Sequence, residues 1–62
     1  MTQKELLYLE DAIGHEKNII SICTESLNYL DDSTLVTFME SETKKHNETL
    51  KKLMKKLKEC AE

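Results

Sequence analysis

The sequence predicts an all-α protein, an antiparallel hairpin of two long helices. Apolar residues recur at alternating spacings of three and four over two long stretches, which lines side chains up along one face of a helix. There is no proline and one glycine, so nothing forces a break inside either stretch. The only mid-chain turn signal is Asp31-Asp32-Ser33. A connection this short brings the second helix back antiparallel to the first.

The first helix is predicted over residues 3–30. Thr2-Gln3-Lys4-Glu5 matches a capping box, so the helix is expected to begin there. Its main stripe occupies positions a and d of a heptad pattern, and Glu16 is the one exception to its apolar character. The stripe consists of Leu6, Leu9, Ile13, Glu16, Ile20, Cys23, Leu27 and Leu30.

The apolar surface of this first helix is wider than a two-stranded seam requires. Positions c and g adjoin the main stripe on the helical wheel. Position c holds Tyr8, His15, Ile22 and Tyr29, and position g holds Ala12, Ile19 and Ser26. A helix with this surface is expected to contact more than one neighbour.

The second helix is predicted over residues 34–60, after a turn at 31–33. Its stripe holds Val36, Met39, Thr43, His46, Leu50, Leu53, Leu57 and Cys60, in which Thr43 and His46 are polar. We expect it to bury Leu35, Val36, Met39, Leu50, Leu53, Met54 and Leu57. It turns six lysines outward at positions b, c and f: Lys44, Lys45, Lys51, Lys52, Lys55 and Lys58.

The position of the turn sets which residues face each other. Numbers of facing residues should sum to about 63, so Glu16 is expected to face His46 or Asn47. The two cysteines, Cys23 and Cys60, then lie at different heights, too far apart for an intrachain disulfide. We expect both to act as small hydrophobes, with Cys60 exposed at a frayed helix end.

Composition limits the classes of function. A core in a chain of 62 residues rarely supplies more than about 3–5 kcal/mol of stability, so a partner is expected, most simply a second copy. The net charge of -3 argues against a nucleic-acid binder, and the lysines are interpreted as a solvated face. No apolar run approaches the roughly 20 residues of a membrane span, and no signal peptide is recognised. The chain is therefore expected to be soluble and cytoplasmic.

Glu16 in the first stripe and Thr43 and His46 in the second are polar at matching heights, and we call them the polar layer. This layer is the feature that points to a specific function. A buried glutamate needs a cation, a metal or several hydrogen-bond donors, and His46 can answer Glu16 in two ways. It can pair with the carboxylate and fix the register of the helices. Alternatively, Glu16 and His46 can ligate iron, manganese or zinc, with Glu42 as a third ligand one turn away. His15 lies about 100° round the helix from Glu16, so we do not expect it to join them.

Two short motifs resemble a known family. Leu-Glu-Asp-Ala-x-x-His-Glu-Lys-Asn, from Leu9 to Asn18, and Phe-Met-Glu-Ser-Glu-x-x-x-His, from Phe38 to His46, look like the small ferritin-like proteins related to the spore coat protein F family. The resemblance implies a ferritin-like four-helix bundle, completed here by dimerisation, and an association with the spore coat. The residue three before His46 is Thr43, so the Glu-x-x-His motif of dinuclear bundles is met only in part.

Two classes of function remain. The first is a structural or interaction module, a hairpin that homodimerises into a four-helix bundle and docks on other helical proteins through Tyr8, His15, Ile22 and Tyr29. The second is a small metal-binding protein with a Glu/His site. The sequence shows no nucleophile with an adjacent base, no glycine-rich phosphate loop and no paired cysteine motif, so we do not expect an enzyme.

Overall fold

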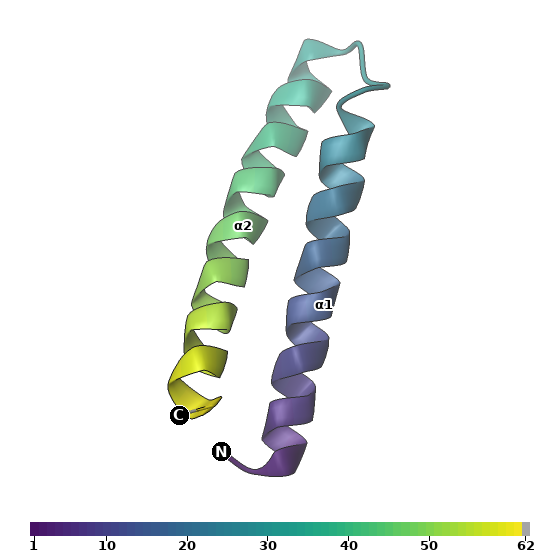
Figure 1. The fold of residues 1–62 in the computed structure, drawn as a ribbon. Coiled ribbons are helices and arrows are strands. Elements are labelled where there is room, and N and C mark those ends of the chain that lie inside the picture. Colours follow the sequence, from purple (N-terminus) through teal and green to yellow (C-terminus); the bar gives the residue numbers. More distant parts are fainter. Residues whose placement is uncertain (62) are drawn as a thin grey trace.

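The protein is a hairpin of two helices that lie side by side along most of their length (Figure 1). The computed structural model describes residues 1–61, and the side chains of residues 1–60. Helix α1 spans Gln3–Ser26 and helix α2 spans Ser33–Ala61, with no strand among these residues. The hairpin measures 45 × 14 × 12 Å. The predicted all-α hairpin is therefore confirmed.

Helix α1 begins with the predicted capping box. The amide of Glu5 donates to Thr2 Oγ1 over 3.1 Å, and the amide of Thr2 donates to Glu5 Oε1 over 2.9 Å. Two amides that the first helical turn leaves without intrahelical acceptors are satisfied in this way. The Glu5 carboxylate also places negative charge at the positive end of the helix dipole.

Helix α1 ends at Ser26, four residues before its predicted end at residue 30. The α-helical hydrogen-bonding pattern stops there. The amides of Asn28 and Tyr29 donate to the carbonyls of Glu25 and Ser26, three residues back instead of four. Ser26 Oγ also donates to the carbonyl of Ile22 over 2.7 Å, a contact that weakens a helix locally. The connection thus covers residues 27–32 instead of the predicted 31–33.

Helix α2 begins one residue before its predicted start and is capped by Asp32. Asp32 Oδ1 accepts hydrogen bonds from the amides of Thr34, at 2.9 Å, and Leu35, at 3.0 Å. An aspartate at this position satisfies free amides and favours the positive end of the helix dipole. Of the three residues in the predicted turn signal, Asp32 is therefore the cap.

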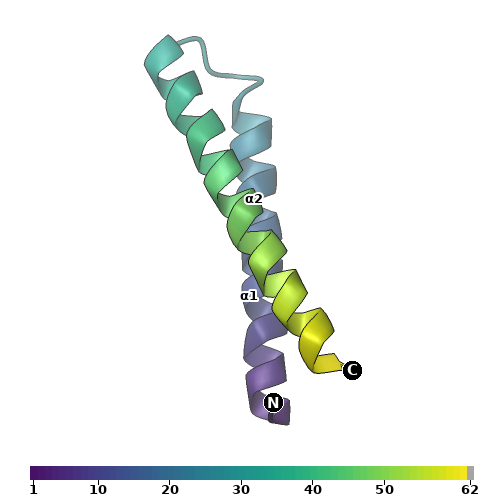
Figure 2. The same cartoon turned by 90° about the vertical axis from the view of Figure 1, so that its left-hand side faces the viewer.

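The interface between the helices is a single layer. Only Ile13 and Cys23 are buried among residues 1–60, with 8% and 7% of their surface exposed. The other members of the two predicted stripes are half-buried, except Cys60, which is exposed. The predicted stripes are thus confirmed as the contact surface, but one hairpin covers them only in part. Figure 2 shows that α2 crosses α1 obliquely, so that in this view the two helices overlap near mid-length and separate toward both ends.

Leu35 and Met54 are exceptions to the predicted core. They keep 49% and 47% of their surface exposed, although the sequence predicted that both are buried. With Val36 at position a, Leu35 falls at position g and Met54 at position e, the two positions that flank the stripe. Such positions are covered only when a further layer packs on the pair.

The outward surface of α2 is basic, as predicted. Six lysines on it are exposed: Lys44, Lys45, Lys51, Lys52, Lys55 and Lys58. Neither helix, within the residues described, contains a segment long and apolar enough to cross a membrane.

Candidate functional site

The polar layer predicted from the sequence is formed by Glu16 of α1 and His46 of α2. His46 Nδ1 lies 2.6 Å from Glu16 Oε2, and the two side chains keep 24% and 18% of their surface exposed. An ionised carboxylate only accepts, so Nδ1 donates the hydrogen. Among residues 1–60, this is the one hydrogen bond that joins a side chain of α1 to a side chain of α2. The predicted register is confirmed, because 16 and 46 sum to 62.

A second carboxylate lies on the other side of the imidazole. His46 Nε2 is 3.5 Å from Oε2 of Glu42, which precedes it by one turn of α2. Glu42 Oε1 is also 3.6 Å from Lys45 Nζ, and the Glu42 side chain is 24% exposed. The site is therefore a row of polar contacts across the hairpin that runs from Glu16 through His46 and Glu42 to Lys45.

The sequence interpretation missed the role of Lys45. We placed it among the solvent-facing lysines, and its side chain is indeed 69% exposed. Lys45 follows Glu42 by three residues, the i,i+3 spacing at which opposite charges pair on a helix surface. That spacing was visible in the sequence, and it indicates the contact.

Thr43, the other polar interruption of the second stripe, does not join the layer. Its hydroxyl donates to the carbonyl of Met39 over 2.8 Å, so its hydrogen-bonding need is met within α2. His15 also stays apart, as predicted. It is 72% exposed and lies 3.6 Å from Asp11 on the surface of α1. Both residues are thus accounted for outside the polar layer.

The three candidate metal ligands, Glu16, His46 and Glu42, are brought together, but the imidazole separates the two carboxylates. Glu16 contacts Nδ1 and Glu42 contacts Nε2, which lie on different edges of the ring. Among the described residues, no group of three or more His, Cys, Asp and Glu side chains is arranged to hold a metal ion. No buried side-chain nitrogen or oxygen among them lacks a hydrogen-bond partner. What a single hairpin forms is therefore a satisfied polar link.

The cysteines behave as predicted. Cys23 is buried, Cys60 is exposed, and both are free thiols. Their positions in the interface and at the open end leave them out of the polar layer.

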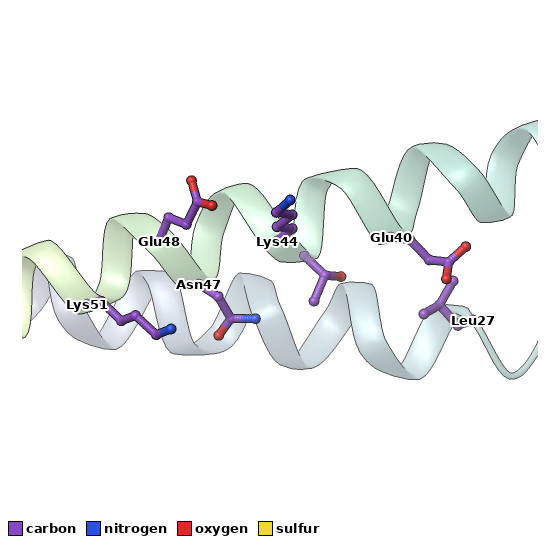
Figure 3. Close-up of a pocket in the computed structure, with 7 residues that line it drawn as sticks. Leu27, Glu40, Lys44, Asn47, Glu48 and Lys51 are labelled. Carbon is purple, nitrogen blue, oxygen red and sulfur yellow. The ribbon is translucent and has the colours of Figure 1, made fainter.

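A surface hollow lies along the interface between the helices (Figure 3). It is lined by Leu27, Glu40, Thr43, Lys44, Asn47, Glu48 and Lys51. Figure 3 shows Glu48 pointing away from α1, and no set of polar groups converges on one point. We interpret this hollow as a solvated, mixed-charge surface and not as a ligand pocket.

Comparisons with known proteins do not place the chain in a family. No protein-family model, no curated protein and no solved structure matches it. The resemblance to the ferritin-like spore coat proteins therefore stays a prediction, and function has to be argued from the hairpin itself.

Proposed function

We propose that this protein is a helical interaction module that acts by self-association, with two hairpins packing face to face into a four-helix bundle. The observation that carries the proposal is an apolar surface that the hairpin leaves uncovered. Among residues 1–60, eight large hydrophobic side chains are exposed, and four of them fall at heptad positions c or g: Tyr8, Ile22, Leu35 and Phe38. A fifth, Tyr29, lines a surface hollow together with Ile22. Together with Ala12 and Ile19, we call these residues the c/g face.

Both helices contribute to this face because they run antiparallel. In an antiparallel pair, the g positions of the two helices lie along one edge of the interface and the e positions along the other. Ala12, Ile19 and Thr49, at g, are half-buried. Thr24 and Asn47, at e, are exposed, and the hollow of mixed charge lies on their side. Exposed large hydrophobic side chains therefore gather at positions c and g, whereas the e positions carry one, Met54, among polar residues.

The exposed area of the hairpin also supports the proposal. A folded monomer of 7.2 kDa exposes roughly 4,100 Å² by the usual scaling of surface with mass. This hairpin exposes 5053 Å². The excess, about 900 Å², is close to the roughly 800 Å² that each partner buries in a stable interface.

The test is the mass in solution, by light scattering and sedimentation, of the native chain and two glutamate variants. Ile22→Glu places a charge on the c/g face, and Thr24→Glu places the same charge at an exposed e position of the same helix. We expect the native chain and Thr24→Glu to be dimers, and Ile22→Glu to lose the dimer. A native chain that is monomeric at every concentration measured, or an Ile22→Glu dimer as tight as the native one, rejects the proposal.

A second candidate function is metal binding, and the row of contacts from Glu16 through His46 to Glu42 is the observation that favours it. Carboxylate and imidazole ligands suit iron, manganese or zinc. One hairpin does not present them to a common point, so binding requires the imidazole to turn or a second copy to add ligands. Elemental analysis of the purified protein tests this. Stoichiometric metal that disappears in a Glu16→Ala, His46→Ala variant supports a metal site, and a metal-free native dimer rejects it.

A further inference from the structure

Charge is distributed unevenly along the long axis of the hairpin. The half that contains the turn, residues 18–43, carries five carboxylates and no lysine: Glu25, Asp31, Asp32, Glu40 and Glu42. The half at the open end, residues 1–17 and 44–60, carries all nine lysines and six carboxylates. Since the helices are paired along their length, these sequence ranges are also the two spatial halves (Figure 1). Their net charges are about -5 and +3 with neutral histidines.

Some of these charges occupy the same heptad positions, c and g, as the residues of the c/g face. Lys45 and Lys52 occupy c positions of α2, and Lys56 occupies a g position, all within the open half. Glu42 occupies a g position in the turn half. When two hairpins pack through this face, these side chains therefore lie in or beside the interface.

From this distribution we infer that the two hairpins of the dimer pack antiparallel, so that the turn end of each lies against the open end of the other. The inference rests on the proposed self-association. A parallel dimer brings the basic open half that contains Lys52 and Lys56 against the basic open half of the partner, and like charges across an interface are strongly disfavoured. An antiparallel dimer places these lysines on the acidic turn half of the partner. Their hydrocarbon stems can then cover Phe38 and Tyr29, which the hairpin leaves 57% and 79% exposed.

The antiparallel arrangement also gives the polar layer a place in the assembly. Glu16 and His46 lie near mid-length of the hairpin, so a twofold axis perpendicular to the helices passes close to them. Glu42 and Nε2 of His46 lie toward the g edge, which the partner covers. The polar layers of the two copies therefore meet at the centre of the bundle. They would also meet in a parallel dimer, but there the two acidic ends would lie together.

Distances between spin labels distinguish the two orientations. With Cys23→Ala, the native Cys60 is the one thiol, and it marks the open end. In the antiparallel dimer the two labels lie at opposite ends, about 45 Å apart. In a parallel dimer they lie within roughly 20 Å, about two helix spacings. A control label at Asn18→Cys, exposed at mid-length, in a Cys23→Ala, Cys60→Ser background, gives a short distance in either orientation.

The outcomes separate this inference from the proposal beneath it. A long distance from Cys60 together with a short one from the label at residue 18 supports the antiparallel dimer. Short distances from both labels mean that the hairpins dimerise in parallel, which overturns the inference and leaves the proposed function standing. The absence of any intermolecular distance from either label means that no dimer forms, and both fail.

The salt dependence of the dissociation constant gives an independent check. Opposite charges that face each other are screened by salt, so the antiparallel dimer should dissociate several-fold more readily at 1 M than at 0.05 M sodium chloride, a range over which the screening length falls by about 3- to 5-fold. A parallel dimer brings like charges together and should become tighter over the same range. A tighter dimer at high salt therefore contradicts the antiparallel arrangement.

Discussion

His46 and Glu16 are thirty positions apart in the chain, and their side chains form a hydrogen bond of 2.6 Å at mid-length of the hairpin. The residues around them in both stripes are mainly apolar, so this bond is specific to one alignment of the helices. A shift of α2 by one turn would place Glu16 opposite an apolar or hydroxyl side chain. The pair thus selects the register in which every other layer also matches.

Replacing His46 by leucine removes the partner of Glu16 and leaves its carboxylate half-buried. We expect the free energy of unfolding to fall by roughly 1 kcal/mol, the low end of the cost for an unsatisfied group, because both side chains keep some contact with water. The double variant Glu16→Leu, His46→Leu should recover this loss or exceed the native stability, since two apolar groups replace a polar pair. Denaturant unfolding of the three proteins measures both effects. A double variant less stable than His46→Leu would mean that the layer does more than fix the register.

Gly14→Ala should stabilise the protein by about 1 kcal/mol. Glycine weakens a helix interior relative to alanine by this amount, and a Cβ added at Gly14 meets no atom within 4 Å. Position 14 lies on the outer side of α1, away from the c/g face, so the mass of the assembly should not change. Thermal unfolding followed by circular dichroism measures the gain. The reverse change, Ala12→Gly on the same helix, should cost at least as much.

The capping box of α1 should make the first helical turn sensitive to acid. The pKa of the Glu5 carboxyl is held below its ordinary 4.5, mainly by the hydrogen bond from the backbone amide of Thr2 and secondly by the Thr2 side chain. A carboxyl with a lowered pKa in the folded state stabilises that state above its ordinary pKa, and this contribution is lost as the pH falls through the lowered value. The protection of the Thr2 amide against exchange, measured by NMR relative to its intrinsic rate at each pH, should therefore fall as the pH drops below about 4.5. Glu5→Gln should show little such change; an equal change in that variant would assign the effect to another group.

The cap of α2 gives a matched pair of variants. Asp32→Ala removes the oxygen that accepts from the amides of Thr34 and Leu35, and it should lower the free energy of unfolding by about 1 kcal/mol. Asp31→Ala removes the same charge from the adjacent position, whose side chain accepts neither of these hydrogen bonds. It should have a smaller effect. Equal losses in the two variants would show that the charge of the turn matters more than the cap.

The sequence was sufficient for the register and for the members of the contact surface. Periodicity placed Leu6 through Leu30 and Val36 through Leu57 on facing stripes, and counting from the turn brought Glu16 to His46. Both results follow from the regular geometry of a helix. Once the connection is known, the position of every residue along the helix axis, and so the residue that faces it, is determined. The capping box was predictable for a similar reason, because its two hydrogen bonds depend on residues three positions apart.

The end of α1 was not predictable from the same pattern. Leu27 and Leu30 continue the apolar spacing and are half-buried, yet neither lies within the helix. Periodicity reports which side chains face the partner helix, whereas the helix end depends on which carbonyls accept the hydrogen bonds of residues 28 and 29. The exposure of Leu35 and Met54 was missed for a different reason. The facing helix covers positions a and d, so the side chains at the flanking positions g and e stay partly exposed in a two-helix hairpin.

The open end of the hairpin determines how the molecule responds to a pulling force. Residue 1 and the last described turn of α2 lie at the same end (Figure 1). A load applied between them acts across the helix interface and not along it, so the helices separate one contact layer at a time, starting from Leu6 and Leu57. The hydrogen bond between Glu16 and His46, at mid-length, then resists further separation of the helices. Under a load at the open end, the contacts between the helices therefore break in order from that end, and those beside the turn break last.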